Sequence, residues 1–475
     1  MKTRFLPDGL TLTRYVMAGV VLTGLVYACY RLYAGNLVVP SLTALGLWVA
    51  CFVLGLFVLK RSASPTVSVT LIIAGAVIIR FLFFQLLNDG YSIADAWHNT
   101  ALASSVASGE GLDFYDPHTK LVFHALYPPV LPLLIAGLMR LGLDTPLGFW
   151  GMNVGFDLLS ILLLVRLARA LGAPMAGHLA AWCFAVWPPF VALSMLVQKE
   201  SLATLELMVI LMLLSSLYQS FHIRWSIAAA LGLASGLLAL TQPAMALFPG
   251  LAALFLFWRR GVRYLLELGL KVAPFALLLL MPWWVRNWLV LGSFVPLTTT
   301  MGYGIWIASH AGATGMYAPL PSALAHGGEV ATGARLATAG VEWLMQHPLE
   351  WLRITMIKVV KALSREDFFP FIAGPNAPFG ANGFQNIRQF VFQAAHTGLV
   401  AYCAIGAKRL KASPLFPPMR LIFAAACVSL IFSAIPFEFA ERHRYILVLL
   451  LFLMAGVVMA PPARANLEMQ RPTIG

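Results

Sequence analysis

The feature that most constrains this chain is a series of apolar runs, each about as long as a helix that crosses a lipid bilayer. Such a helix needs about 20 mainly apolar residues, and a spanning segment must satisfy its own backbone hydrogen bonds. The sequence therefore predicts an all-α, polytopic transmembrane bundle of about 12 spans. The runs lie at about 11–33, 40–59, 67–87, 148–171, 175–194, 200–220, 225–241, 243–258, 265–290, 385–406, 415–436 and 444–460.

The composition excludes an ordinary soluble protein. Of the 475 residues, 60% are hydrophobic and 11% are charged, whereas soluble domains carry about 25% charged residues. The five cysteines form no CxxC pair and no Cys/His metal spacing, so we expect them to be small packing residues.

The net charge of +13 does not indicate a nucleic-acid-binding protein, because the basic residues form no patch with interleaved aromatic residues. They form short clusters between apolar runs, as in cytoplasmic loops that follow the positive-inside rule. We expect both termini to be cytoplasmic. The clusters are Lys60-Arg61, Arg166 with Arg169, Arg259-Arg260 with Arg263, and Lys408-Arg409 with Lys411.

This topology places two long connections, 88–147 and 291–383, on the external face, and it leaves a cytoplasmic tail at 461–475. Connections of this length are usually functional. Within them, the segment from Tyr127 to Arg140 and the segment from Trp351 to Leu363 are predicted to be interfacial helices.

Ionisable residues at membrane depth are costly, so those near the external face are candidates for function. Asp157 and Glu206 lie within spans and are expected to be polar contacts between helices. The candidates near the external face are Asp89, Asp95, His98, Lys199, Glu200, Glu206, Arg286, Lys358, Glu441, Arg442, His443 and Arg444.

Several short motifs occur along the chain in a fixed order. They are Asp95-Ala96-Trp97-His98, Gly109-Glu110-Gly111, Tyr127-Pro128-Pro129, Lys199-Glu200, Leu240-Thr241-Gln242-Pro243, Pro282 to Asn287 (a PWxxRN motif), Gly312 to Gly315, His347-Pro348 with Lys358, and Arg442 to Tyr445. In this order the motifs resemble those of GT-C glycosyltransferases, in particular the bacterial family-39-like branch, which is related to protein mannosyltransferases and lipid A aminoarabinose transferases. The resemblance covers about 67–460 and leaves 1–60 as two additional N-terminal helices before a catalytic module at 61–460.

The resemblance implies that Asp95 is the catalytic carboxylate, which activates an acceptor hydroxyl to attack the anomeric carbon and invert its configuration. Asp89 is the second candidate, and the plainer alternative for Asp95 is a helix N-cap. Arginines suit phosphate because they stay charged and bind two oxygens. The predicted substrate-binding residues are Lys199, Glu200, Arg286, Lys358, Arg442, His443, Arg444 and Tyr445; interface anchoring is their alternative.

No metal site is predicted. The paired acid that is common after the first helix of the family is absent here, so a divalent metal is not indicated, although the resemblance leaves one open. The residues Asp113, Asp116, His118 and His124 fit no known ligand spacing and are expected to belong to a solvated loop. No other cofactor is indicated.

The predicted function is transfer of a sugar from a polyprenyl-phosphate carrier to a lipid, glycan or protein acceptor. The resemblance implies a bacterial cytoplasmic membrane with the active site outside. Two alternatives stay open: a flippase or transporter of a lipid-linked saccharide, and an O-antigen ligase or polysaccharide polymerase. Paired broken helices near mid-membrane would favour transport. The sequence leaves the sugar and the acceptor open.

Overall fold

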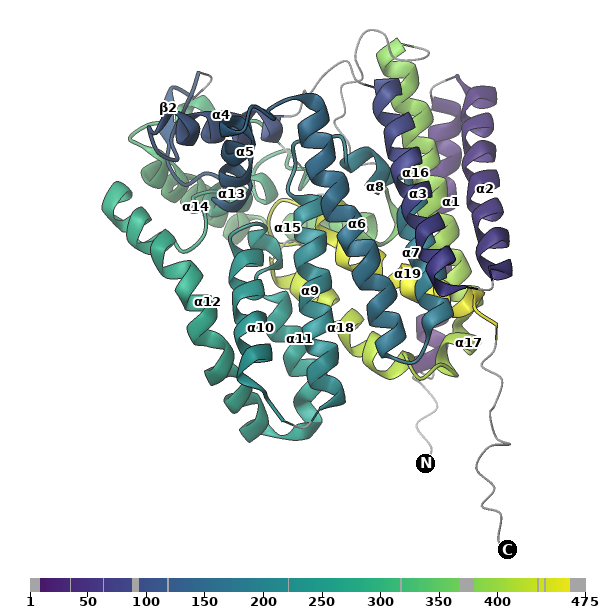
Figure 1. Ribbon diagram of the computed structural model, residues 1–475. Coiled ribbons are helices and arrows are strands. Elements are labelled where there is room, and N and C mark those ends of the chain that lie inside the picture. Colours follow the sequence, from purple (N-terminus) through teal and green to yellow (C-terminus); the bar gives the residue numbers. More distant parts are fainter. Residues whose placement is uncertain are drawn as a thin grey trace, which may run out of the picture.

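Most of the predicted apolar runs form long helices that lie side by side (Figure 1). The computed structural model describes residues 9–34, 36–62, 64–87, 94–117, 119–220, 222–316, 318–366, 380–433, 435–439 and 441–461. The main helices of the bundle are α1 (Gly9–Ala34), α2 (Val38–Arg61), α3 (Pro65–Leu87), α6 (Pro146–Ala170), α9 (Glu200–Gln219), α10 (Trp225–Ala239), α12 (Val262–Leu291), α16 (Gly380–Ile405), α18 (Phe416–Ser433) and α19 (Tyr445–Met459).

The all-α membrane fold is confirmed, but the predicted number of about 12 spans is not. In the described part of the chain, eight helices are long and apolar enough to cross a bilayer. Proline accounts for much of the difference, because it interrupts helices. The run at 175–194 breaks into α7 (Pro174–Val186) and α8 (Pro188–Leu193), and the run at 243–258 forms only η1 (Pro243–Met245) and α11 (Phe248–Phe257).

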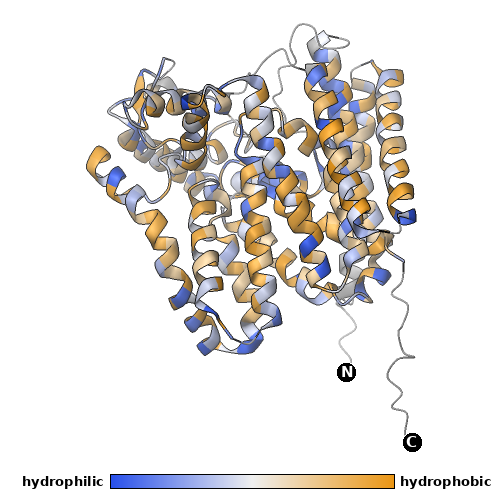
Figure 2. Cartoon of the chain, in the orientation of Figure 1, coloured by the Kyte–Doolittle hydropathy of each residue, from blue (hydrophilic) through white to orange (hydrophobic). Residues whose placement is uncertain are grey.

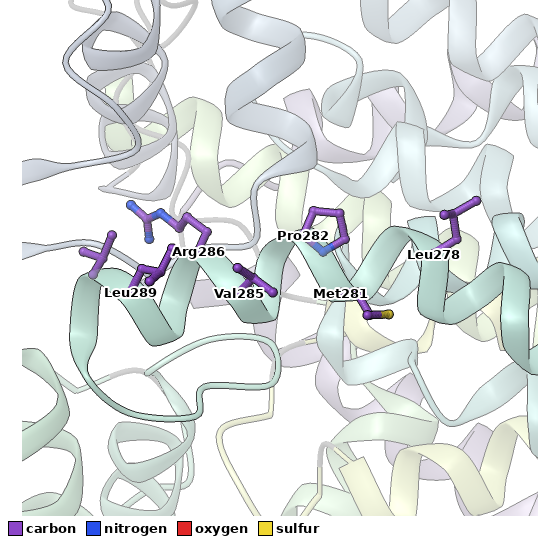
Figure 3. A pocket seen from close by; sticks show the side chains of 7 residues that line it. Leu278, Met281, Pro282, Val285, Arg286 and Leu289 are labelled. Atoms are coloured by element: carbon purple, nitrogen blue, oxygen red, sulfur yellow. The ribbon is translucent and has the colours of Figure 1, made fainter.

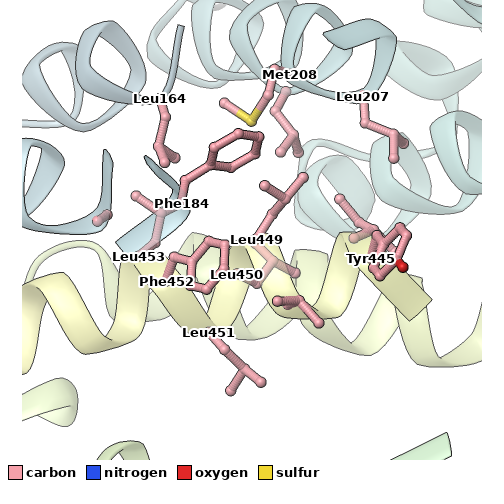
Figure 4. Packing of buried hydrophobic residues seen from close by; sticks show 14 of the residues in the cluster. Leu164, Phe184, Leu207, Met208, Tyr445, Leu449, Leu450, Leu451, Phe452 and Leu453 are labelled. Atoms are coloured by element: carbon pink, nitrogen blue, oxygen red, sulfur yellow. The ribbon is translucent and has the colours of Figure 1, made fainter. Parts of the chain in front are cut away.

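Helix α19 lies in the interior of the bundle and packs against α7. Phe452 meets the edge of the Phe184 ring at a centroid distance of 6.2 Å, within a cluster of leucines from several helices (Figure 4). Gly456 permits the close approach, because a Cβ there would lie 2.3 Å from the carbonyl oxygen of Ala176. Close packing over small residues is how helices associate where lipid tails are as apolar as leucine.

The two N-terminal helices pack on the rest of the bundle, α1 against α16 and α2 against α7. The indole N–H of Trp48 donates to the Val186 carbonyl at 2.8 Å, and that of Trp182 donates to the Phe52 carbonyl at 3.0 Å. These two bonds run in opposite directions between α2 and the α7 segment, so they fix the register of the pair.

The elements of the two long connections, among them α4 (Ala94–Ser108), α5 (Val130–Arg140) and α14 (Glu329–Gln346), gather at one end of the bundle, which we call the loop end (Figure 1). Hydrophilic residues concentrate at the ends of the bundle and in one interior region near this end (Figure 2). The other elements outside the main bundle are β1 (Phe114–Asp116), β2 (Leu121–Phe123), α13 (Met301–Ala308), η3 (Ser322–Leu324), α15 (Pro348–Ser364), η4 (Glu441–Arg444), η2 (Trp258–Arg260) and α17 (Ala407–Lys411).

The first long connection contains a two-stranded antiparallel hairpin, which the sequence analysis missed. Phe114 pairs with Phe123, and Asp116 pairs with Leu121. The strands are three residues long, too short to give a clear alternating pattern. Both predicted interfacial segments are helices, as α5 and α15.

A buried ion pair joins α3 to α6. The Arg80 Nε donates to Asp157 Oδ2 at 2.9 Å, and both side chains are fully buried. Arg80 Nη1 also donates to the Ala185 carbonyl at 2.7 Å, which adds α7 to the junction. Asp157 is therefore a contact between helices, as its position within a span predicted.

Removal of one partner of this pair should destabilise the bundle strongly. Asp157→Asn leaves the Arg80 guanidinium buried without its counter-charge, at a cost of about 3–5 kcal/mol. Thermal unfolding in detergent should show a large loss of Tm, whereas Arg80→Met with Asp157→Leu should recover most of it. The control is Glu267→Gln, which removes an exposed pair with Lys271. A Tm for Asp157→Asn equal to that of the control would contradict this prediction.

Candidate active site

The carboxylate of Asp95 is held by partners from two distant parts of the chain. Asp95 lies in the first turn of α4. The hydroxyl of Tyr127, which lies between β2 and α5, donates to Oδ1 at 2.9 Å. Arg442 Nη1, at the start of the last span, donates to Oδ2 at 2.8 Å and forms an ion pair there. Both oxygens are therefore engaged by side chains rather than by the backbone amides that an N-cap would bind.

Tyr127 also contacts His98, one helical turn after Asp95. The His98 Nδ1 lies 3.2 Å from the Tyr127 hydroxyl oxygen. Because the only phenolic proton is donated to Asp95, this contact requires a proton on Nδ1 of His98. The orientation of the tyrosine is thus set from both sides.

Lys199 and Glu200 reach the same place from the start of α9, where Lys199 is the N-cap residue and Glu200 is the first residue of the helix. The backbone of the turn before α9 is held to α6, because the Asn153 amide donates to the carbonyl oxygens of Ser194 at 3.3 Å and Leu196 at 2.6 Å. Lys199 Nζ lies 5.8 Å from the centre of the Tyr127 ring. Glu200 Oε1 lies 3.7 Å from the Nε of Arg442.

Glu438 supplies a third carboxyl group from the connection between α18 and η4. It is half-buried, and its charge acts on Arg442, Asp95 and Lys199. We refer to Asp95, Tyr127, Lys199, Glu200, Glu438 and Arg442 as the Asp95 cluster. Its members come from four segments of the sequence, which converge at the loop end of the bundle.

The cluster perturbs its own ionisation. Burial alone would raise the pKa of Asp95, but the charges of Arg442 and Lys199, with the hydrogen bonds from Tyr127 and Arg442, hold it well below its usual range. Burial lowers the pKa of Lys199 and raises that of Glu438. Carboxyl groups with opposite shifts in one site are typical of functional sites.

Arg286 lies elsewhere and binds the first long connection. Its Nη1 donates to the His124 carbonyl at 2.5 Å, and its Nη2 donates to the Leu112 carbonyl and to Asp113 Oδ1, each at 3.0 Å. Asp113 Oδ1 also lies 2.6 Å from His124 Nδ1. Arg286 is the one charged side chain on an apolar surface hollow along α12 (Figure 3).

Glu329, which the sequence analysis did not single out, ties the two long connections together. It begins α14 and is buried. Its carboxylate accepts from the backbone amides of His124 at 3.0 Å and Ala125 at 3.1 Å, and from the Thr299 hydroxyl at 3.1 Å. Burial raises its pKa.

Lys358 is fully buried and does not reach the cluster directly. Its Nζ donates to the carbonyl oxygen of Phe437 at 2.9 Å, and burial lowers its pKa to about 8. Its aliphatic part passes Gly315, where a Cβ would lie 2.5 Å from the Lys358 chain and φ is +73°. Lys358 thus supports the segment that carries Glu438.

Arg444 and Tyr445 point into the protein interior. Arg444 pairs with the buried Glu366 at 2.5 Å and donates to the Ala362 carbonyl at 2.5 Å, so it fastens the end of α15. The Tyr445 ring packs 5.0 Å from that of Phe190. His443 is half-buried with its ring 6.0 Å from Phe439. Among the predicted residues at this turn, Arg442 forms the ion pair with Asp95.

Asp89 and His118 lie outside the described residues. Among the residues described, no group of three or more His, Cys, Asp or Glu side chains could hold a metal ion. Glu206 is buried and accepts from the hydroxyl of Thr241, just after the end of α10, at 2.8 Å, so it links α9 to that turn.

Two members of the cluster were missed as site residues. Tyr127 belongs to a motif that carried the family resemblance, but nothing in the sequence pairs it with Asp95. Glu438 is the acidic residue of a short apolar connection, and such a position alone does not indicate function. The one feature of the sequence that could have indicated Glu438 is its position four residues before Arg442.

The comparison with protein families matches residues 127–286, about a third of the chain, to the model described as dolichyl-phosphate-mannose-protein mannosyltransferase. This stretch includes Tyr127, Lys199, Glu200 and Arg286. Comparison with curated proteins gives no match.

Solved structures of an archaeal oligosaccharyltransferase share the fold at low sequence identity. The Archaeoglobus fulgidus oligosaccharyltransferase in the apo form matches with a TM-score of 0.51 and 14% identity over 84% of this chain and 50% of that chain. The same enzyme tethered to an acceptor peptide matches with a TM-score of 0.51 and 14% identity, over 84% of this chain and 49% of that chain. For ArnT from Cupriavidus metallidurans bound to undecaprenyl phosphate the TM-score is 0.43 and the identity 14%, over 84% of this chain and 77% of that chain.

The chain therefore has the fold of GT-C membrane glycosyltransferases, as the sequence resemblance predicted. It spans about half the length of the oligosaccharyltransferase that it matches.

The contacts of Arg286 predict a structural role. Arg286→Ala removes bonds to two carbonyl oxygens and one carboxylate, at a local cost of about 1–3 kcal/mol. Hydrogen exchange at 112–124 should become about 10-fold to 100-fold faster. Arg353→Ala is the matched control, because Arg353 forms an exposed pair with Glu350. Unchanged exchange at 112–124 in Arg286→Ala would leave the predicted phosphate-binding role as the better account.

Proposed function

We propose that this protein is a membrane glycosyltransferase that moves a sugar from a polyprenyl-phosphate carrier to an acceptor hydroxyl. The observation that carries the proposal is the ion pair of Asp95 with Arg442 beside Lys199, in a site built at one end of a GT-C bundle. The matched family is described by its dolichyl-phosphate-mannose donor, and the match begins at Tyr127. This supports a lipid-phosphate donor here.

Arg442 and Lys199 are the proposed phosphate-binding residues. A guanidinium binds two phosphate oxygens at once, and an ammonium adds a second positive charge. As the bond from the anomeric carbon to the phosphate oxygen breaks, negative charge grows on the departing lipid phosphate. Cations fixed beside it stabilise that charge more in the transition state than in the ground state.

Asp95 is the proposed general base. Its low pKa keeps it ionised, but a carboxylate that is bound to Arg442 is a poor proton acceptor. A donor phosphate competes for Arg442 and so releases Oδ2 of Asp95, which becomes more basic. The carboxylate then takes the proton of the acceptor hydroxyl, whose oxygen attacks the anomeric carbon from the face opposite the phosphate and inverts its configuration.

The positive-inside pattern supports a site on the external face of a bacterial cytoplasmic membrane, since the basic clusters are predicted at the opposite, cytoplasmic end. Glu200 is the proposed partner that keeps Arg442 oriented when Asp95 releases it. The sugar and the acceptor stay open, because every donor of this class carries the same phosphate.

Asp95→Asn should abolish transfer while the protein still binds donor. The amide keeps the size of the carboxylate but cannot accept the proton, and general-base catalysis contributes about 10²- to 10⁴-fold. The assay follows label leaving a panel of radiolabelled polyprenyl-phosphate sugars in the presence of cell-envelope extract. Asp144→Asn, an exposed acid in the same connection, should transfer like the wild type. Wild-type protein that binds such lipids without releasing sugar would favour a flippase instead.

Arg442→Gln should weaken donor use as well as turnover. The variant loses a charged contact worth about 1.5–3 kcal/mol, so kcat/KM should fall about 10-fold to 150-fold. Arg442→Lys should recover part of the loss, because it restores the charge without the two-pronged geometry. Steady-state kinetics with the active donor tests this, with Arg353→Gln as the exposed control. Equal kcat/KM for Arg442→Gln and the control would exclude Arg442 from phosphate binding.

A further inference from the structure

The Glu438 carboxyl group lies at the Asp95 cluster with no hydrogen bond or ion pair to any residue that the structure describes. Its half-buried side chain nevertheless interacts electrostatically with Arg442, Asp95 and Lys199. Asp95 and Glu200, in contrast, both pair with Arg442. An unused carboxyl beside two phosphate-binding cations calls for a physical explanation.

The backbone on both sides of Glu438 is held firmly. The Phe437 carbonyl accepts from the buried Lys358 at 2.9 Å, and the Phe439 amide donates to the Gly315 carbonyl at 3.1 Å. The Phe439 side chain is fully buried. These contacts hold Glu438 beside the cluster, so a ligand there would meet a carboxyl group whose place is already fixed.

The charge balance of the cluster explains what this carboxyl group can do. With all groups ionised, three carboxylates (Asp95, Glu200 and Glu438) oppose two cations (Lys199 and Arg442), which gives a net charge of −1. A donor phosphate diester adds another negative charge. A proton on Glu438 brings the empty cluster to zero and removes one like charge from the side of the phosphate.

We propose that Glu438 is a further donor-binding residue, which takes up a proton as the lipid phosphate binds and donates a hydrogen bond to one of its oxygens. This inference rests on the proposed function. The one bond that forms is the O–H bond of the Glu438 carboxyl group, whose proton comes from the solvent and stays there while the phosphate is bound.

Glu438 is the member of the cluster best suited to carry this proton. Burial raises the pKa of Glu438. The charge of Asp95 raises it further, and the charges of Arg442 and Lys199 lower it by less than this sum. The pKa of Asp95, in contrast, is lowered. A raised pKa means that protonated Glu438 is available nearer neutral pH. The groups that interact electrostatically with Glu438 are Asp95 on α4, Tyr127, Lys199 and Arg442. The titratable or charged groups that contact or act on these or on the neighbouring backbone are His98 on α4, Glu200 on α9, His443 on η4 and Lys358 on α15.

The test measures binding of farnesyl methyl phosphate, a diester with one fixed negative charge, to purified protein in detergent. The range from about pH 5 to about pH 8 avoids titration of the probe itself. Uptake of one proton on binding should tighten the wild-type Kd up to about tenfold for each pH unit of acidification. Glu438→Gln should bind as tightly as the acidic wild type, with a Kd that does not change with pH.

Two further variants sharpen the result. Glu438→Ala should bind more weakly than Glu438→Gln at low pH, because it lacks a donor. Glu350→Gln, an exposed control, should keep the wild-type slope. A wild-type Kd that is independent of pH, or a slope retained in Glu438→Gln, would overturn the assignment of Glu438 while leaving the proposed transferase intact. Absence of binding by the wild type at every pH would instead remove the proposed function and this inference with it.

Discussion

The pairing of buried guanidinium groups is the constraint on which this bundle depends. An arginine without a partner in an apolar interior costs several kcal/mol, so each such residue has to find an acceptor on another segment. Arg80 joins α3 to α6 and α7 through Asp157 and a carbonyl oxygen. Arg444 joins the last span to the end of α15 through Glu366. Apolar packing alone leaves the register of helices loosely defined, and these directional contacts fix it.

Arg442 also pairs with a carboxylate, but its partner, Asp95, lies at the candidate active site. Arg442 lies two residues before Arg444, and residues two apart on a helical turn point to different sides. Arg444 faces the interior and pairs with a fully buried acid, whereas Arg442 faces Asp95 at the half-buried cluster. One turn of chain thus supplies both a fixed structural contact and the cation that the proposed function assigns to the donor phosphate. The structural contact anchors the turn, so Arg442 is positioned before any ligand arrives.

The sequence was sufficient for most of the helices but only for part of the site. The run at 200–220 became α9 almost residue for residue, because apolar length alone decides such a helix. Asp95 and Arg442 were both candidates, yet their contact spans most of the chain and no local pattern encodes it. Lys358 shows a second limit of sequence analysis. The sequence around it is typical of a helix at the membrane interface, but its side chain packs over Gly315 and is buried. Which face a charged side chain takes depends on segments that are distant in the sequence.

The contact between Asp95 and Arg442 also implies an order of events under the proposed function. While the donor is absent, both oxygens of Asp95 are occupied, one by Tyr127 and one by Arg442. An acceptor hydroxyl that arrived first would have to displace a charged partner with a neutral one, which is unfavourable. A phosphate can make that displacement, because it offers Arg442 an anion in exchange for the carboxylate. Under the proposed function the base is therefore released only when the sugar donor is in place, so that donor binding precedes activation of the acceptor.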